Sequence, residues 1–185
     1  VVGDIKGNAL QMLSCLKEHN GKTDLVIFPE LFLCGYPPED LLNVSGFLDQ
    51  IDAQIKTLLE STRELPAFLL PIPEREGDTL YNSVHLCEGG KIIHTHRKAE
   101  YPNYGVFDEK RYFKTGNKPQ CTTFKGHRIG FMICEDMWLS DVAQTMKQDG
   151  AEFFTTNAPD DVSVAQFAAQ DFGKANEHHI AMGVA

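Results

Sequence analysis

Short apolar runs that end at a proline or at a cysteine constrain this chain more than any other feature of its sequence. They occupy residues 25–28, 66–73 and 129–133. A run of about four to eight apolar residues is typical of a strand that is covered on both faces. Segments with apolar residues at helical spacing lie between these runs, at residues 8–19, 46–63 and 140–149. The alternation predicts an α/β fold in which helices cover a mixed β-sheet.

Two turns indicate hairpins inserted into this pattern. Glu88–Gly90 and Lys125–His127 each contain glycine and each separate two strand-like runs. Turn residues between two such runs favour antiparallel pairing. We therefore expect hairpins at both positions, in addition to the strands that alternate with helices.

The ends of the chain suggest that the domain continues beyond them. We interpret Val1–Asp4 as the tail of a strand, residues 162–178 as a helix and residues 180–185 as the start of a last strand. No repeat or linker divides the sequence. We therefore expect residues 1–185 to form one domain that is incomplete at both ends.

Charge and cysteine content narrow the class of protein. The 185 residues carry a net charge of −9 with a pI near 5.2, which argues against nucleic acid or an anionic membrane as the main partner. The sequence contains no apolar run of the length that a membrane helix needs. The five cysteines show no paired spacing and no CxxC motif, so the sequence indicates no zinc or other metal site. Reduced thiols suggest a cytoplasmic protein.

A cysteine follows directly after one of the apolar runs. Residues 129–133 end at Cys134, and Glu135 and Asp136 come next. In α/β proteins the ends of strands tend to carry the chemistry. A thiol with an ordinary pKa of about 8.5 becomes a nucleophile when a nearby base removes its proton. The commoner alternative is a cysteine that is simply packed in the core.

Two other strand ends carry groups that could activate this thiol. Glu30 follows the run 25–28, and Lys98 follows the strand-like residues 91–96. If the strands before Glu30 and Cys134 are neighbours, both side chains project from the same sheet edge. A carboxylate in a dry pocket can accept and return a proton. An ammonium group beside the thiol would stabilise a developing oxyanion. The alternatives are a capping or surface glutamate and a solvated lysine.

A cysteine–histidine dyad is the competing arrangement. The candidate histidines are His94, His96 and His127, on or beside strands, and His178 and His179, in the last predicted helix.

Three segments resemble the signatures of the nitrilase, or carbon–nitrogen hydrolase, superfamily. They are Leu25–Glu30 (LVIFPE) followed by Gly35–Leu42 (GYPPEDLL), Arg97–Lys98 with Pro102–Phe113 (PNYGVFDEKRYF), and Ile129–Trp138 (IGFMICEDMW). Tyr81-Asn82-Ser83 also fits. The first two segments resemble, more narrowly, the glutaminase domains of glutamine-dependent NAD synthetases. The likeness runs in order over nearly the whole chain.

The resemblance implies a fold and a set of catalytic residues. The fold is the nitrilase-like α-β-β-α sandwich with mixed β-sheets. The family triad falls on Glu30 as the general base, on Lys98 as the residue that stabilises the tetrahedral intermediate with the backbone amide of Glu135, and on Cys134 as the nucleophile. Glu109 matches a second glutamate that positions the lysine and the base.

The resemblance also implies a substrate, a product and partners. Tyr104 and Glu135 match residues that hold the amino-acid end of the substrate. Glutamine would be hydrolysed through a thioester, and the ammonia would amidate deamido-NAD to NAD. The hydrolase domain would need no cofactor. ATP and Mg²⁺ would belong to a synthetase domain or subunit, for which this sequence contains no ATP-binding loop. Homo-oligomers are typical of the family.

One segment departs from the family pattern and leaves alternatives open. Asn157–Asp161 reads NAPDD where the family usually has NASP. The serine expected near the glutamine carboxylate is missing, and Asp160 and Asp161 would repel a carboxylate. One alternative is therefore an amidase for another small amide. The other is a non-catalytic chain that keeps the nitrilase fold.

Overall fold

The helices and strands of the chain follow the apolar pattern of the sequence. The computed structural model describes residues 1–101 and 108–157. Its α-helices are α1 (Ile5–Glu18), α2 (Phe47–Ser61) and α3 (Ser140–Gln148), and its short 3-10 helices are η1 (Glu39–Asn43), η2 (Glu109–Arg111) and η3 (Cys134–Met137). Its strands are β1 (Leu25–Ile27), β2 (Ala67–Glu76), β3 (Thr79–Glu88), β4 (Lys91–Arg97), β5 (Thr122–Phe124), β6 (His127–Ile133) and β7 (Phe153–Asn157).

The described strands form two mixed sheets. The order in the first sheet is β1-β2-β3-β4, with β1 parallel to β2 and the remaining pairs antiparallel. The order in the second sheet is β5-β6-β7, with β5 antiparallel and β7 parallel to β6. Both predicted hairpins are confirmed as β3–β4 and β5–β6. The parallel pairs are joined by segments that contain α2 and α3, as short parallel crossovers require.

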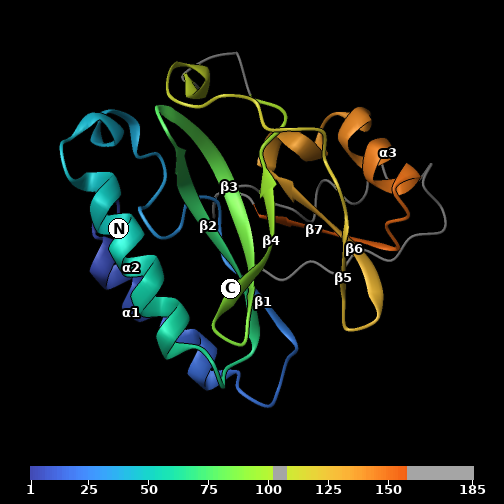
Figure 1. Ribbon diagram of the computed structural model, residues 1–185, viewed down its shortest axis with the longest axis horizontal. Helices are drawn as coiled ribbons and strands as arrows, with labels where there is room; N and C mark the ends of the chain where they lie inside the picture. The colour runs from blue at the N-terminus through green and yellow to red at the C-terminus, as the bar shows by residue number, and fades with distance from the viewer. Residues whose placement is uncertain (102–107, 158–185) are drawn as a thin grey trace.

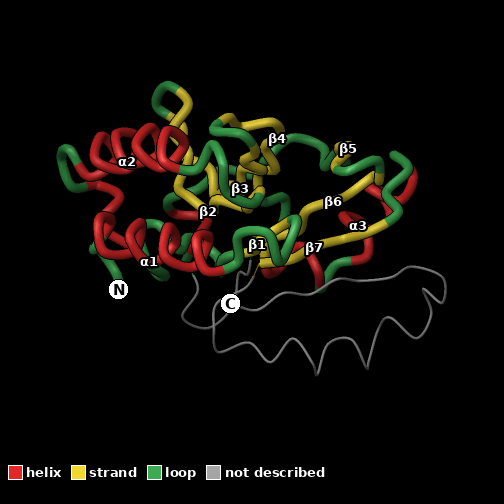
Figure 2. Tube along the Cα trace, turned by 90° about the horizontal axis from the view of Figure 1, so that it is seen from below, coloured by secondary structure: helices red, strands yellow, loops and turns green. Residues whose placement is uncertain are grey.

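The two sheets lie between layers of helix (Figures 1 and 2). Alternate residues of β2 explain this arrangement. Phe68 and Leu70 pack with the apolar faces of α1 and α2, whereas Leu69 packs in a cluster with Phe131 and Ile133 of β6. On β6 the alternation continues, because Met132 faces Val142 and Met146 of α3. The predicted α-β-β-α sandwich with mixed sheets is confirmed.

The first helix begins where the sequence provides a cap. The side chain of Asp4 accepts a hydrogen bond of 2.9 Å from the backbone N–H of Gly7, which satisfies one of the unpaired donors of the first turn. The buried residues Ile5, Ala9, Met12 and Leu16 then recur at helical spacing on the face that meets the sheet. None of the described helices is long and apolar enough to cross a membrane.

One expectation from the sequence was wrong. Val1–Asp4 is a turn rather than the tail of a strand, since Gly3 has a φ of 79° and Asp4 caps α1. The strands before Glu30 and Cys134 are not neighbours in one sheet, because β1 and β6 belong to different sheets. They meet through packed side chains, with Ile27 and Ile133 in the same cluster. The helix and strand expected at residues 162–178 and 180–185 lie outside the described residues.

The cluster between the two sheets should carry a large part of the stability. Leu69, at 0% exposure, lies within it, whereas Leu10 on α1 is 68% exposed. Leu69→Ala should lower the free energy of unfolding by about 2–5 kcal/mol, because it leaves a cavity in a closely packed layer. The matched control Leu10→Ala should change it by about 0.5 kcal/mol or less. Urea denaturation of both variants measures the difference, and equal effects would contradict this description of the core.

Candidate active site

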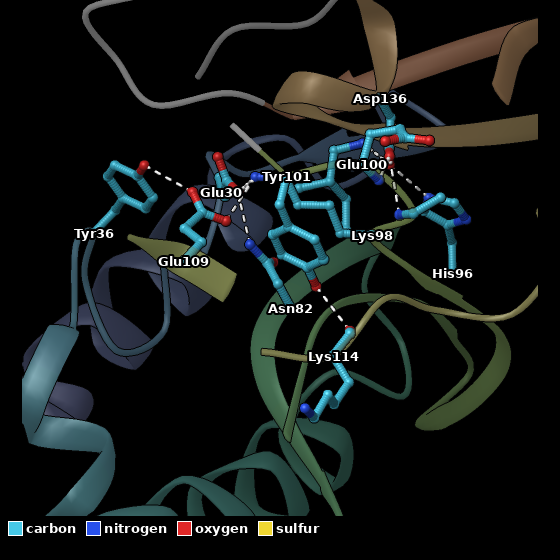
Figure 3. Close-up of polar contacts among 12 residues, drawn as sticks. Glu30, Tyr36, Asn82, His96, Lys98, Glu100, Tyr101, Glu109, Lys114 and Asp136 are labelled. Carbon is cyan, nitrogen blue, oxygen red and sulfur yellow. Dashed lines mark hydrogen bonds and ion pairs between the residues drawn. The ribbon is translucent and has the colours of Figure 1, made fainter. Parts of the chain in front are cut away.

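A buried lysine joins the candidate residues from three parts of the chain. The Nζ of Lys98 donates to Oε1 of Glu30 at 2.7 Å and to Oε2 of Glu109 at 2.9 Å (Figure 3). Lys98 is 0% exposed and Glu30 is 1% exposed. Three of the four residues predicted to be catalytic therefore form one ion-paired group, in which Lys98 and Glu30 are shielded from bulk water.

Two further side chains donate hydrogen bonds to the carboxylates of this group. Asn82 of β3 donates through Nδ2 to Oε1 of Glu30 at 2.7 Å, and the hydroxyl of Tyr36 donates to Oε1 of Glu109 at 3.0 Å. The backbone N–H of Lys98 donates to the carbonyl oxygen of Asn82 at 2.8 Å. Each glutamate thus has a second donor besides Lys98, and this fixes the orientation of both carboxylates.

Each of these three residues lies near the end of a regular element. Glu30 follows β1, Lys98 comes directly after β4, and Glu109 is the first residue of η2. Rigid strands thus bring side chains that are 68 residues apart in sequence, Glu30 and Lys98, into direct contact. Positions of this kind are typical of residues that a scaffold holds for chemistry.

Cys134 begins the short helix η3, directly after β6, with a left-handed φ of 43°. This backbone conformation is rare for residues other than glycine and costs on the order of 1–3 kcal/mol, so it persists only where the surrounding structure imposes it. Figure 1 shows that β4 and β6, which precede Lys98 and Cys134, come from sheets that lie next to each other. Cys134 is half-buried, and the charges of both Glu30 and Lys98 act on its thiol.

Burial and neighbouring charges set the protonation of these groups. Burial raises the pKa of Glu30, Lys98 lowers it and Glu109 raises it again, with a net value of about 7. For Lys98, burial lowers the pKa, but the charges of Glu30 and Glu109 outweigh burial and raise it above its ordinary value. Burial, and then the charge of Glu30, raise the pKa of the Cys134 thiol, although Lys98 lowers it. The resting thiol is therefore protonated at neutral pH and needs a base.

The two side-chain oxygens of Glu30 differ in their hydrogen bonding. Oε1 accepts both hydrogen bonds, whereas the buried Oε2 has no hydrogen-bond partner among residues 1–101 and 108–157. An unpaired buried carboxylate oxygen is costly unless it acts on a ligand or a neighbouring group. A general base with a pKa near 7 can both accept and return a proton at neutral pH.

The sequence also pointed to Glu135 and Tyr104 as substrate-binding residues. Glu135 adjoins Cys134, and its charge raises the pKa of the thiol. Tyr104 lies outside the described residues, as do His178 and His179.

The histidines of the described part are engaged in other contacts. His96 pairs with Asp136, His127 pairs with Glu152, and His94 packs against Phe131. These contacts give the cysteine–histidine dyad no support.

Sequence reasoning assigned no role to Tyr36, Asn82 or Asp136. Tyr36 and Asn82 lie within the segments that resemble the family signatures, so the signal was present, but only geometry reveals the carboxylate that each one contacts. Asp136 stands beside the nucleophile segment's Cys134 and Glu135. Its hydrogen bonds to distant backbone could not be read from the sequence.

Comparison with known proteins places this arrangement in a family. The Carbon-nitrogen hydrolase family model matches residues 1–181. The chain is similar to a glutamine-dependent NAD(+) synthetase from Aquifex aeolicus, with 38% identity over 153 residues, covering 82% of this chain and 27% of the relative. It is also similar to one from Xanthomonas campestris pv. campestris, with 41% identity over 133 residues, covering 71% of this chain and 24% of the relative. The chain thus spans about a quarter of the length of these curated relatives.

Solved structures agree with the fold. A glutamine-dependent NAD+ synthetase from Acinetobacter baumannii, in complex with ADP, superposes with a TM-score of 0.81 at 28% identity, covering 94% of this chain and 34% of that one. An amidase from Nesterenkonia sp. superposes with a TM-score of 0.85 at 20% identity, covering 98% of this chain and 71% of that one, which supports the fold alone. With a family match over residues 1–181 and a nitrilase-type sandwich, the chain belongs to the carbon–nitrogen hydrolase family.

Proposed function

We propose that this chain hydrolyses the side-chain amide of glutamine, as part of a hydrolase domain that supplies ammonia to NAD synthesis. The observation that carries the proposal is the buried Lys98, paired with Glu30 and Glu109, whose charge acts on the thiol of Cys134. The relatives named glutamine-dependent NAD(+) synthetases support glutamine as the substrate.

In the proposed reaction, Oε2 of Glu30 takes the proton of Cys134 while Sγ attacks the carboxamide carbon. Lys98 and the backbone N–H of Glu135 stabilise the tetrahedral oxyanion. Glu30 returns the proton to the leaving nitrogen, so that ammonia departs and a thioester remains. Glu30 then takes a proton from water, which attacks the carbonyl carbon of the thioester. The C–S bond breaks, glutamate leaves, and Glu30 returns the proton to Sγ, which restores the thiol.

The other groups have supporting roles in this proposal. Glu109 holds Lys98 and orients Glu30 through it. Tyr104 and Glu135 bind the amino-acid end of glutamine, where a carboxylate such as Glu135 suits the α-ammonium group. The hydrolase step uses no cofactor. ATP and Mg²⁺ are assigned to a synthetase domain or subunit that uses the ammonia, and residues 1–185 to one hydrolase domain.

The cellular compartment and the oligomeric state of the protein are also part of the proposal. All five cysteines are free thiols, which suits a reducing compartment such as the cytoplasm. Assembly into a homo-oligomer is proposed from the family resemblance alone.

A specific observation favours a second candidate, an amidase for another small amide. Asp160 and Asp161 stand in the segment where the family usually has a serine near the glutamine carboxylate. Turnover of glutamine compared with that of uncharged aliphatic amides separates the two candidates. If the uncharged amides react faster, such an amide becomes the proposed substrate in place of glutamine, and the proposed catalytic residues stay the same.

Cys134→Ala should reduce ammonia release from glutamine by about 10⁴-fold or more, because it removes the nucleophile. The matched control Cys15→Ala, in α1, should keep wild-type activity. Mass spectrometry after treatment with a thiol-directed glutamine analogue should place the adduct on Cys134. The assay is run with and without a synthetase partner. Residual activity of Cys134→Ala near the wild-type rate would end the hydrolase proposal, and no activity of the wild type in either condition would favour a non-catalytic chain.

The value of kcat/KM should rise as the pH increases through about 7, because Glu30 must lose its proton before it can accept one from Cys134. Below that pH Glu30 is protonated and activity falls. Glu30→Gln should lose activity at every pH, since an amide cannot act as a base. Steady-state kinetics from about pH 5.5 to about pH 8.5, roughly 1.5 pH units on each side of the expected midpoint, test this. A flat profile for the wild type would argue against Glu30 as the base.

Lys98→Met should lower the free energy of unfolding at pH 8 by about 3–5 kcal/mol, because it leaves Glu30 and Glu109 as unpaired buried carboxylates. The double variant Lys98→Met/Glu109→Gln removes one of these charges and should recover part of the loss. Urea denaturation measures both variants. Equal stability of the single and double variants would show that the two carboxylates do not depend on Lys98.

A further inference from the structure

Asp136 has a buried carboxylate whose two oxygens are fully used. Oδ1 accepts hydrogen bonds from the backbone N–H of Ala99 at 3.0 Å and of Glu100 at 2.9 Å. Oδ2 accepts from the backbone N–H of Ile133 at 2.9 Å and from Nε2 of His96 at 2.9 Å. The side chain is 0% exposed. Four donors occupy all the lone-pair directions that a carboxylate offers.

These donors belong to two segments that carry catalytic groups. Ala99 and Glu100 directly follow Lys98, whereas Ile133 directly precedes Cys134. Asp136 and Ala99 are separated by 37 residues in sequence. Figure 3 shows the carboxylate between His96 and Glu100, close to the backbone of Lys98. One side chain thus ties the end of β4 to the turn that follows β6.

The same contacts hold the unusual backbone of the nucleophile. Asp136 lies in η3, and its bond to the N–H of Ile133 closes the turn around Cys134, whose φ is 43°. A left-handed cysteine needs support from its surroundings. The carboxylate of Asp136 supplies this support from within the turn. It also accepts hydrogen bonds from the two residues that follow Lys98.

We propose that Asp136 is a positioning residue that fixes Cys134 relative to Lys98. The inference rests on the proposed function in taking Cys134 as the nucleophile, and it adds a residue that touches neither the substrate nor the reacting atoms. His96 is its partner on the β4 side. Because a carboxylate oxygen only accepts, Nε2 of His96 is the donor in this pair.

Asp136→Asn tests the proposal with little change in shape. In either orientation the new NH₂ group faces at least one backbone N–H that formerly met an oxygen. The two segments should move apart, and kcat for glutamine should fall by about 10²-fold, the order expected for a displacement of about 1 Å. KM should change little, because Asp136 does not contact the substrate.

A second measurement needs no turnover. The rate at which iodoacetamide alkylates Cys134, located by mass spectrometry, should show a pH profile shifted to lower pH in Asp136→Asn. Burial and the charges of Glu30, Glu109 and Glu135 raise the pKa of the thiol, and Lys98 lowers it by less than Glu30 raises it. Because Lys98, Glu30 and Glu109 form one paired group, a thiol that moves away from this group loses more of the raising effects than of the lowering effect. The matched control is Asp149→Asn, because Asp149 also accepts a backbone hydrogen bond, from Cys121 at 2.9 Å, and also lies on a turn. It should keep the wild-type profile. An unchanged profile in a folded Asp136→Asn variant would overturn the proposal.

If Asp136→Asn does not fold, His96 provides a milder pair of variants. His96→Leu removes one of the four donors, and His96→Gln offers an amide N–H in its place. The alkylation profile should shift in His96→Leu and return toward wild type in His96→Gln. A wild-type profile in His96→Leu would count against the proposal.

Failure of this proposal and failure of the proposed function are distinguishable. If the wild type releases no ammonia from glutamine, but the Asp136 and His96 variants show the predicted alkylation shifts, the function is refuted and the positioning role is supported. A wild type that hydrolyses glutamine through Cys134, with an alkylation profile unaffected by Asp136→Asn, would do the reverse.

Discussion

The interaction on which the site depends is the buried pairing of Lys98 with two carboxylates. An ammonium group without exposure to water is stable only where opposite charges and hydrogen bonds replace its hydration. Glu30 and Glu109 supply both, at 2.7 and 2.9 Å. Burial raises the pKa of Glu30, Lys98 lowers it, and the second carboxylate, Glu109, raises it again, to about 7. The pairing thus fixes the geometry of Lys98, and a pKa near 7 would let Glu30 act as the proposed base at neutral pH.

The sandwich makes this pairing possible. Glu30 and Lys98 follow strands of the first sheet, whereas Cys134 follows β6 of the second. The apolar layer that contains Leu69 and Phe131 holds the two sheets face to face and so brings the thiol toward the charged group. Asp136 adds a polar tie across the same boundary. The apolar layer accounts for the approach of the sheets, and the tie accounts for their alignment at the site.

Local pattern predicted the elements, but not how the sheets are divided. Apolar runs and helical spacing located α1, α2, α3 and both hairpins, because each depends on nearby residues. The sequence left open whether β1 and β6 are neighbours, since an apolar run that is covered on both faces looks the same in one sheet as in two stacked sheets. Family-like motifs pointed to Glu30, Lys98, Glu109 and Cys134 as candidates, and their roles stay predictions. Asp136 escaped notice because its partners are backbone N–H groups, which no sequence pattern marks.

The site depends on Glu30 being a buried carboxylate that shares its surroundings with the sulfur of Cys134. The most direct test follows the side-chain carboxyl carbon of Glu30 by ¹³C NMR as the pH is raised, before and after Cys134 is alkylated. The account predicts a midpoint near 7, well above the ordinary value of 4.5, and a shift of that midpoint on alkylation. A midpoint near 4.5 that alkylation leaves unchanged would contradict it.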